Sequence, residues 1–475
     1  MDFKSFLLMG QEIGLITIFL ILFCFDIVAS GKTRSYIYPV ACILFFIHTV
    51  MGFLSMPAGI AFGGMYQSSS ITILMKNILN LATLIIFLQS HTWLKSKTTE
   101  HQLSEFFTIT LVTLLGMYLM ISARNFMMLY IGMETASLPL ACLAAFNKYK
   151  EKSAEAGVKY VLISAFSSGI MLFGLSFIYG SLGTFYFDDL SFNLMKEPLT
   201  ILGFVFFFAG LGFKLSLVPF HLWTADVYEG APTSVTAYLS VVSKAAAAFA
   251  LILALYKVFG NMEGVWQYIL WWLAVITITI GNLFAIRQKD IKRFFAFSSI
   301  SQAGYILLGI ITGTAQGMTA TIFYVLVYLF SNLAAFGVIA AVENASKGNT
   351  LISTLNGLYK NNPKLSLVMM LAVFSLGGIP PLAGFFSKFF IFMAAASEGF
   401  YILVFIALLN TVVSLYYYLL IIKAMFIKNE GPDTVIRFSS DVYNKVSLVL
   451  CTLGIFIVGL LSVFYDQIHS MTFGV

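Results

Sequence analysis

Long apolar runs separated by short polar segments make up almost the whole chain. A helix needs roughly 20 apolar residues to cross the hydrocarbon core of a bilayer. Runs of this kind occur near residues 11–30, 36–56, 71–94, 104–122, 125–147, 157–182, 199–229, 232–256, 265–286, 293–313, 315–342, 365–397, 400–427 and 446–468. The pattern predicts an all-α integral membrane protein with about 14 transmembrane helices, and it leaves little sequence for a domain outside the membrane.

Two of these runs, 199–229 and 365–397, contain proline near their middle: Pro219 in GFKLSLVPFHLW, and Pro380 and Pro381 in GGIPPLAGFFSK. Proline removes a backbone donor and breaks or kinks a helix. A broken helix is tolerated in a membrane only where its loosened backbone lines a cavity or is buried in protein. These are the seventh and twelfth runs, so we expect helices 4–8 and 9–13 to form two inverted five-helix repeats around an ion site at the midplane.

This division predicts a single polytopic membrane domain, residues 1–475, in four parts. The parts are three N-terminal helices in 1–100, a first repeat in 101–258, a second repeat in 264–428 and a C-terminal helix in 429–475. The first run lacks a small-residue cleavage site and a strongly basic start, which favours a retained helix over a signal peptide.

Composition agrees with a membrane location and argues against several kinds of chemistry. Hydrophobic residues make up 60% of the chain and charged residues 10%, whereas soluble domains carry about 25% charged residues. The cysteines stand singly in different apolar runs, as buried space-filling thiols do: Cys24, Cys42, Cys142 and Cys451. The histidines show no paired spacing for haem, and neither a dinucleotide-binding glycine motif nor a Walker loop occurs. We therefore expect no redox centre, cofactor or metal in this chain.

Lysine and arginine are concentrated in every second loop. The loops after odd-numbered runs hold 17 of them: Lys32, Arg34, Lys95, Lys97, Lys148, Lys150, Lys152, Arg287, Lys289, Lys292, Arg293, Lys347, Lys360, Lys364, Lys428, Arg437 and Lys445. The other loops hold Arg124, Lys196 and Lys257. The positive-inside rule then places the odd loops in the cytoplasm and both termini on the outer side of a cell inner membrane. The net charge of +6 thus reflects topology and gives no reason to expect a nucleic-acid partner.

Four ionisable residues lie deep within separate runs, namely Glu134, Lys214, Lys244 and Lys388. Each costs about 2.5–3.5 kcal/mol at the centre of a lipid-facing helix, so together they would cost on the order of 10 kcal/mol. We therefore expect them to face one another or water inside the bundle. A proton relay requires groups whose charge responds to a neighbour's charge, and buried lysines meet this requirement.

Simpler interpretations suit other charged residues. Lys76 and Lys159 stand near run ends, where a lysine can extend its ammonium group to the interface. Lys292 and Arg293 are typical topology determinants, and His221 could be a packed core histidine. A single buried lysine or a single kink can also serve packing alone. A buried lysine beside a broken helix, found twice, favours function.

Three segments resemble the antiporter-like subunits of respiratory complex I: GFKLSLVPFHLWTADVYEGAPT, QKDIKRFFAFSSISQAGY and GIPPLAGFFSKF. The resemblance runs over nearly the whole chain, most clearly over residues 100–430. It is nearest to the N branch of the family, because Lys388 stands where the M branch carries glutamate. One departure is Ala225, which occupies a position where the family usually has proline.

By this resemblance, the chain is similar to proton-translocating subunits that couple electron transfer from NADH to quinone to proton pumping. Glu134 and Lys214 correspond to the family's fifth- and seventh-helix pair, Lys244 to the central lysine of the eighth helix, Lys388 to the exit-side proton site, and Lys159 and His221 to ancillary positions. The resemblance further implies that NADH, FMN, iron–sulfur clusters and quinone are bound by other subunits. It implies the antiporter-like subunit M, the small subunits K and J, and membrane lipid as neighbours.

Two other classes remain open at this point. A subunit of a multisubunit cation/proton antiporter of the Mrp type would have the same helices without a redox partner. A structural spacer in a larger membrane assembly would use the charges only to pack helices, and it would tolerate their conservative removal.

Overall fold

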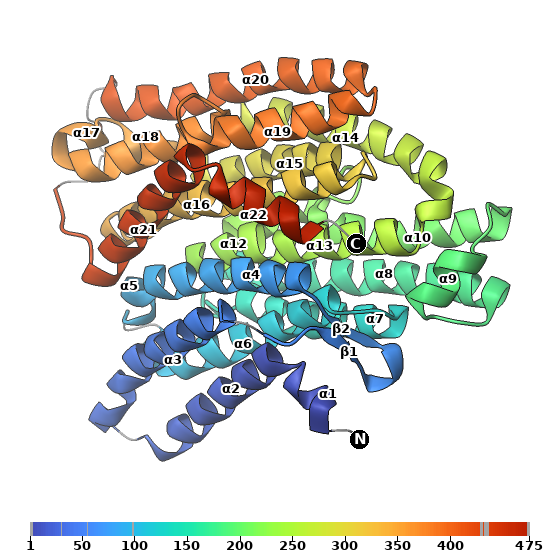
Figure 1. Cartoon of the computed structure of the whole chain (residues 1–475). Coiled ribbons are helices and arrows are strands. Elements are labelled where there is room, and N and C mark those ends of the chain that lie inside the picture. The colour runs from blue at the N-terminus through green and yellow to red at the C-terminus, as the bar shows by residue number, and fades with distance from the viewer. Residues whose placement is uncertain are drawn as a thin grey trace.

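The computed structural model is a bundle of helices lying roughly side by side, with the N-terminal helices along one edge and α20 along the opposite edge (Figure 1). It describes residues 3–29, 31–54, 56–96, 99–427, 431 and 437–472, and only the backbone of residues 3, 4, 31 and 32. Lys97, Lys428 and the start of the 429–475 part, all used in the sequence predictions, lie outside the described residues.

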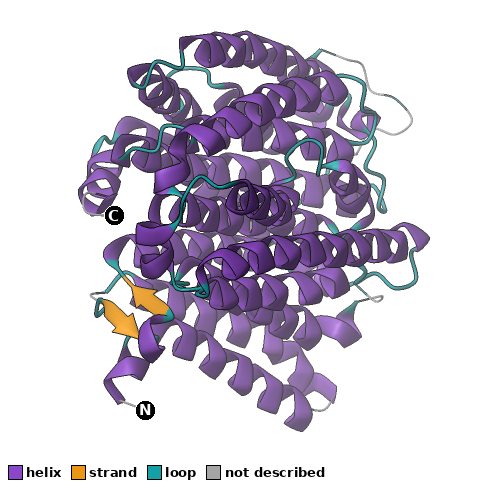
Figure 2. Ribbon diagram, turned by 90° about the vertical axis from the view of Figure 1, so that its right-hand side faces the viewer, coloured by secondary structure: helices purple, strands orange, loops and turns teal. Residues whose placement is uncertain are grey.

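The elements follow one another with short connections. The N-terminal elements are α1 (Phe3–Leu7), α2 (Gly10–Val28), α3 (Ile37–Gly52), β1 (Gly59–Ala61), β2 (Tyr66–Ser68), α4 (Ser70–Gln89) and α5 (His91–Leu94). The next are α6 (Leu103–Ile121), α7 (Phe126–Ala144), α8 (Glu151–Leu182), α9 (Phe187–Asn193), α10 (Pro198–Leu215), α11 (Leu222–Gly230), α12 (Thr233–Tyr238) and α13 (Lys244–Lys257). The last are α14 (Glu263–Ala285), α15 (Ile291–Ile310), α16 (Ala315–Ala345), α17 (Leu358–Asn361), α18 (Pro363–Gly377), α19 (Ala383–Ser397), α20 (Tyr401–Phe426), α21 (Val442–Leu460) and α22 (Val463–Thr472). Strands β1 and β2 pair as a small antiparallel hairpin, drawn in orange in Figure 2.

Within the described ranges, twelve helices are long and apolar enough to cross a membrane. Two more of the predicted runs are occupied by α15 and by the shorter pair α18 and α19. The predicted all-helical, multi-pass membrane architecture is confirmed, whereas the count of fourteen spans, the inverted repeats and the four-part division remain predictions.

Helix α16 and the continuous stretch from α12 to α13 form the centre of the bundle. α16 packs against α4, α15, α18, α19, α21 and α22, which come from widely separated parts of the chain. The outer helices instead expose large apolar side chains, such as Phe166 on α8 and Val412 on α20. A surface of this kind suits lipid, because every backbone polar group is already bonded within its helix.

Both predicted breaks are present, and the same backbone motif ends the helix before each. α10 stops at Leu215, and the amide of Leu217 then donates to the carbonyl of Gly212, 2.9 Å away. α18 stops at Gly377, and the amide of Ile379 donates to the carbonyl of Phe374, 3.0 Å away. This bond from the second residue after the helix back to its last turn is the Schellman motif, which satisfies carbonyls that a helix end leaves free.

Close packing of α6 against α7 fixes the helix that carries Glu134. A Cβ on Gly116 would lie 2.4 Å from the backbone nitrogen of Ala136, and one on Gly132 would lie 2.6 Å from that of Met120. Small residues let membrane helices approach to backbone contact. Glycine is therefore required at both positions.

The prediction that all four cysteines are buried is wrong for two of them. Cys42 and Cys451 are buried, but Cys24 and Cys142 are exposed on the outer surfaces of α2 and α7. Hydropathy cannot separate these cases, because a thiol is compatible with both lipid and the protein interior.

Candidate functional site

Lys214 lies in the last turn of α10, immediately before the first break, and its side chain is buried. Its Nζ donates to the hydroxyl of Tyr160 on α8 at 3.0 Å and lies 5.5 Å from the centre of that ring. A cation in the last turn of a helix is also favoured by the helix dipole. The break thus ends α10 where its dipole can stabilise an ammonium group inside the bundle.

Lys388 is arranged differently around the second break. It lies on α19, after the break, and its Nζ donates back to the carbonyl of Gly377, the last residue of α18, at 3.3 Å. The ring of Tyr305 lies 4.8 Å from the same nitrogen. Lys388 therefore also sits at the negative end of a half-helix, although that half-helix is not its own.

Lys244 lies between these two lysines in the sequence and begins α13. The preceding residues, Leu239–Ser243, form a π-helical turn, a feature often found at functional sites. The Nζ of Lys244 donates to the hydroxyl of Ser299 on α15 at 2.8 Å, and it lies 5.7 Å from the centre of the Tyr228 ring. Among the described residues, none of the three lysines has a carboxylate within 4.0 Å of its nitrogen.

Glu134 lies half-buried on α7 and forms no direct ion pair with Lys214 within that distance. Its charge acts on Lys214 through space. Its Oε1 is buried without a hydrogen-bond partner in the structure. The sequence analysis paired Glu134 with Lys214. In the structure, the hydroxyl of Tyr160 makes the direct contact with Lys214 instead.

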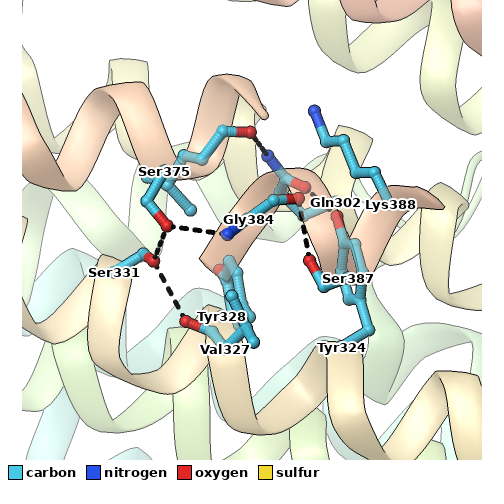
Figure 3. Close-up of a pocket in the computed structure, with 10 residues that line it drawn as sticks. Gln302, Tyr324, Val327, Tyr328, Ser331, Ser375, Gly384, Ser387 and Lys388 are labelled. Atoms are coloured by element: carbon cyan, nitrogen blue, oxygen red, sulfur yellow. Dashed lines mark hydrogen bonds between the residues drawn. The ribbon is translucent and has the colours of Figure 1, made fainter. Parts of the chain in front are cut away.

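Two small cavities lie beside Lys244 and Lys388 and share part of their lining. Each has a volume of ≈ 10 Å³, about the space that one water molecule needs. One is lined by Lys244 and the other by Lys388, and both are lined by Gln302 and Tyr328. Figure 3 shows the second cavity, with Ser331 donating to the hydroxyl of Ser375 at 2.7 Å. Polar side chains therefore continue from one lysine to the other.

Unpaired polar atoms also occur around the first break and on α16. The buried side-chain oxygens without a hydrogen-bond partner in the structure include those of Ser216 beside Lys214, Thr224 on α11 and Asn332 on α16. Leaving such an atom unsatisfied costs about 1–3 kcal/mol. Water molecules at these positions would remove that cost.

The two ancillary residues lie in different surroundings. His221 lies half-buried at the end of the first break, and the charge of Lys244 acts on it. Lys159 lies on α8 with its side chain 38% exposed, and its Nζ forms ion pairs with Asp226 at 2.5 Å and Glu155 at 2.6 Å. Arg293 on α15 contacts Asp226 as well, at 2.6 Å. Lys159 therefore belongs to an ion-pair cluster that joins α8, α11 and α15, apart from the three buried lysines.

The interpretation of Lys76 as a lysine that extends to the interface is wrong. Its Nζ is buried and lies 2.6 Å from Oε1 of Glu12, whose side chain is 0% exposed. The hydroxyl of Tyr66 lies 3.1 Å from both carboxylate oxygens of Glu12 and accepts from Lys76 at 3.1 Å. Lys76 stands near the end of its apolar run in the sequence. In the folded chain, however, Glu12 of α2 packs against it and both side chains are buried.

Sequence reasoning missed the hydroxyl partners of Lys214 and Lys244 and the amide that lines both small cavities. Tyr160, Ser299 and Gln302 had no assigned role, although Ser299 and Gln302 stand in SSISQAGY, one of the segments that carry the family resemblance. Polar residues recurring within the apolar run 293–313 were the available signal. No comparable signal marks Tyr160, because tyrosine is common in membrane helices.

Comparisons with known proteins agree with this geometry. A family model described as NADH:quinone oxidoreductase/Mrp antiporter, TM, matches residues 123–414. The NADH-quinone oxidoreductase subunit N of Azobacteroides pseudotrichonymphae is 65% identical over 477 residues, covering 100% of this chain and 99% of that protein. A chain of the Thermus thermophilus respiratory complex I with bound aureothin is 30% identical with a TM-score of 0.79, covering 95% of this chain and 97% of that one. A chain of the Mrp complex from Dietzia sp. reaches a TM-score of 0.85 at 19% identity, covering 99% and 97%, and shows a shared fold.

The multi-pass bundle with two broken helices and a line of buried lysines is thus that of the antiporter-like membrane subunits. Sequence identity decides the branch within this class, because this chain shares far more of its sequence with the subunit N relative than with the Mrp chain. The chain belongs to the subunit N family of NADH-quinone oxidoreductases. The resemblance predicted from sequence motifs is confirmed, and the Mrp alternative has less support.

Proposed function

We propose that this chain carries protons within an NADH-quinone oxidoreductase along Lys214, Lys244 and Lys388, with Glu134 as the charge that biases Lys214. One observation carries the proposal: three buried lysines on separate helices are each held by a neutral partner. An ammonium group bonded to a hydroxyl or a carbonyl can lose its proton without leaving a carboxylate unpaired. A lysine in a tight ion pair, such as Lys76, has no such freedom.

Proton movement between the lysines requires a hydrogen-bonded connection. The two water-sized cavities shared by Gln302 and Tyr328 support one between Lys244 and Lys388. The unpaired oxygens of Ser216 and Thr224 support hydration around the first break. In this scheme a change of charge near Glu134 moves a proton from Lys214 to Lys244, and Lys388 then releases it.

His221 and Lys159 have supporting roles in this proposal. His221 lies where the charge of Lys244 reaches it, so its imidazole would extend the relay at the first break. Lys159 would act indirectly, because it holds Asp226 on α11, the half-helix that follows the break. It is a positioning residue rather than a member of the line.

The surroundings of the chain follow from its family. Its relatives are subunits of an oxidoreductase complex, so other complex I subunits are its partners. We propose that its neighbours in the cell inner membrane are an antiporter-like subunit M, the small subunits K and J, and membrane lipid. NADH, FMN, iron–sulfur clusters and quinone would be bound by other subunits, whose redox energy would drive the protons.

The test is charge removal in the intact complex. Lys214→Met and Glu134→Gln are expected to lower NADH-driven proton pumping and coupled quinone reduction while the complex still assembles. Lys257→Met is a matched control, because Lys257 is a partly buried lysine at the far end of the helix that Lys244 begins. If both site variants assembled and pumped as the control does, the relay assignment would be wrong.

Purification in the native membrane separates this proposal from the Mrp alternative. A tagged chain is expected to co-purify with NADH dehydrogenase activity and with proton uptake that a quinone-site inhibitor blocks. Sodium- or potassium-driven proton exchange without NADH oxidation would instead place the chain among standalone antiporters.

A further inference from the structure

Two adjoining cavities lie at the end of the bundle where the lysine-rich loops meet. Their volumes are ≈ 310 Å³ and ≈ 140 Å³, and both are lined by Asn147, Lys150, Pro232 and Glu343. Lys347 lines the first cavity and Lys292 the second. We call the two together the basic vestibule. It lies on the face that the positive-inside rule assigns to the cytoplasm.

Glu343 is the acid that both parts of the vestibule share. It is half-buried near the end of α16, and its Oε2 accepts a hydrogen bond from the hydroxyl of Thr233. A carboxylate near a helix C-terminus is disfavoured by the helix dipole, so its position requires compensation from cations. Lys150 and Lys292, which line the same cavity as Glu343, supply such cations. No basic nitrogen of the described residues lies within 4.0 Å of the Glu343 carboxylate, so its oxygens are not held in a direct ion pair.

Thr233 connects this carboxylate to the lysine line. It is the first residue of α12, which continues through the π-helical turn to Lys244. Lys244 follows Thr233 by eleven residues, or roughly 16 Å along a helix at 1.5 Å per residue. A single buried stretch of helix therefore runs from the floor of the vestibule to the central lysine.

Polar groups occupy the inner part of this path. Ser240 accepts from the amide nitrogen of Asn332 at 2.7 Å and lies 2.9 Å from the hydroxyl of Tyr328. Tyr328 also lines the water-sized cavity beside Lys244. The amide oxygen of Asn332, whose side chain is buried, has no hydrogen-bond partner in the structure. Asn332 and Glu343 share α16, so this unpaired oxygen lies along the path that leads inward from the vestibule.

Between the vestibule and Ser240 the path passes apolar side chains. The vestibule reaches Ser234 and Ala340, and the next side chains inward on the two helices include Ala237 and Phe336, both buried. Ser234 precedes Ser240 by six residues, about 9 Å of helix. An interval of this kind separates an aqueous mouth from a buried site and conducts only when water enters it.

We propose that the basic vestibule is the proton-uptake site of this chain, with Glu343 as its proton-collecting carboxylate and Lys244 as the acceptor. A carboxylate oxygen of Glu343 takes a proton from hydronium and leaves water. The acid then gives that proton, through water and the Ser240–Asn332–Tyr328 group, to the neutral amine of Lys244. The products are an ammonium group at Lys244 and a regenerated carboxylate at Glu343. This inference rests on the proposed lysine relay, because it needs Lys244 to accept protons.

The direct test compares Glu343→Gln with Glu343→Asp in membrane vesicles that contain the complete complex. Glu343→Gln is expected to lose most NADH-driven proton pumping, and Glu343→Asp to keep most of it, because a shorter side chain still carries the titrating group. Glu151→Gln is the matched control: Glu151 is an exposed acid at the start of α8, on the same face and outside the vestibule lining. It is expected to pump like the unmodified complex.

A second measurement does not depend on removing the acid. Ala340→Cys places a thiol in the vestibule wall, and a bulky membrane-impermeant thiol reagent applied from that side should then block pumping. The unmodified complex with the same reagent controls for Cys24 and Cys142, which are exposed elsewhere.

The outcomes separate this inference from the relay. Normal pumping in Glu343→Gln and in labelled Ala340→Cys, together with lost pumping in Lys244→Met, would overturn the vestibule and leave the relay standing. Normal pumping in all three would overturn both. Lost pumping in the labelled cysteine variant supports the vestibule even if Glu343→Gln fails to assemble.

Discussion

Gln302 faces both of the small cavities that separate Lys244 from Lys388. Its amide nitrogen donates to the hydroxyl of Tyr418 at 3.2 Å, and its amide oxygen accepts from Tyr324. A neutral amide can donate and accept at once, but it does not carry an extra proton at ordinary pH. At this position it can orient water between two lysines without holding the proton itself.

The amide of Gln302 should therefore matter for transfer between these lysines. Gln302→Leu keeps a side chain of similar size and removes both hydrogen-bonding functions. We expect normal assembly and clearly reduced proton pumping per NADH oxidised. Gln288→Leu, at a partly exposed position after α14 and outside both cavities, is the control. Equal pumping by the two variants would show that the connection bypasses Gln302.

The Glu12–Lys76 pair poses a question of stability rather than of transport. Removing one partner of a buried ion pair leaves an uncompensated charge and costs about 3–5 kcal/mol, whereas replacing both partners by neutral groups can cost little. Glu12→Gln is thus expected to lower the thermal stability of the purified complex more than the double variant Glu12→Gln/Lys76→Met does. A double variant less stable than the single one would mean that the pair is net stabilising.

Sequence alone identified the buried charges but not their partners. Glu134, Lys214, Lys244 and Lys388 could be recognised because a charge within an apolar run is conspicuous. The partner of Lys76 could not, since Glu12 stands 64 residues away near the start of its own run. Which side chains meet depends on how α2 and α4 are rotated, and hydropathy carries no information about rotation.

At the scale of elements, the second break holds Lys388 through its backbone. Gly378 directly follows α18 with φ at 84°, and a Cβ there would lie 3.1 Å from Cδ of Lys388. Gly399 has a similar φ of 81°, but a Cβ there would have no other atom within 4 Å. The two glycines therefore share a left-handed conformation that disfavours other residues, and they differ in their contact with the lysine.

This pair gives a controlled test of the break. Alanine at either position adopts a left-handed conformation at a cost of about 1–2 kcal/mol. Gly378→Ala and Gly399→Ala should lower thermal stability by similar amounts, and only Gly378→Ala should also reduce proton pumping, because it displaces Lys388 from the Gly377 carbonyl. The measurements are thermal denaturation and pumping of the same two preparations. Unimpaired pumping in Gly378→Ala would mean that the break does not set the position of the lysine.

Both breaks could be placed from proline and glycine, because these residues interrupt a helix for local reasons. Which lysine each half-helix end stabilises could not be predicted in this way. Lys214 uses the dipole of its own half-helix, whereas Lys388 reaches back to the end of the preceding one. That difference arises from three-dimensional packing across the break.

At the scale of the whole molecule, hydropathy predicts which segments enter the membrane but not which become central. The most apolar stretches of α16 and α20 have mean hydropathies of 2.2 and 2.0, yet 94% of the first is buried inside the protein and 28% of the second. Lipid tails are as apolar as leucine, so a lipid-facing helix and a core helix can have the same composition. The central place of α16 became visible only in the packed structure.

Orientation in the membrane is the remaining property of the whole molecule that the sequence predicts. Four lysines of the cation-rich loops line the basic vestibule: Lys150, Lys152, Lys292 and Lys347. If the vestibule faces the cytoplasm, both termini face the outer side, and protons enter at Glu343 on their way outward. Uptake at the vestibule therefore requires the predicted orientation.

Reporter fusions test this orientation directly. Alkaline phosphatase needs disulfides, so it becomes active only on the oxidising outer side of the membrane. A fusion after the last residue, Val475, is expected to be active, and one inserted after Gly348 at the vestibule is expected to be inactive. Green fluorescent protein at the same sites should give the opposite pattern. The reverse result at both sites would place the vestibule on the outer side, where Glu343 could only release protons.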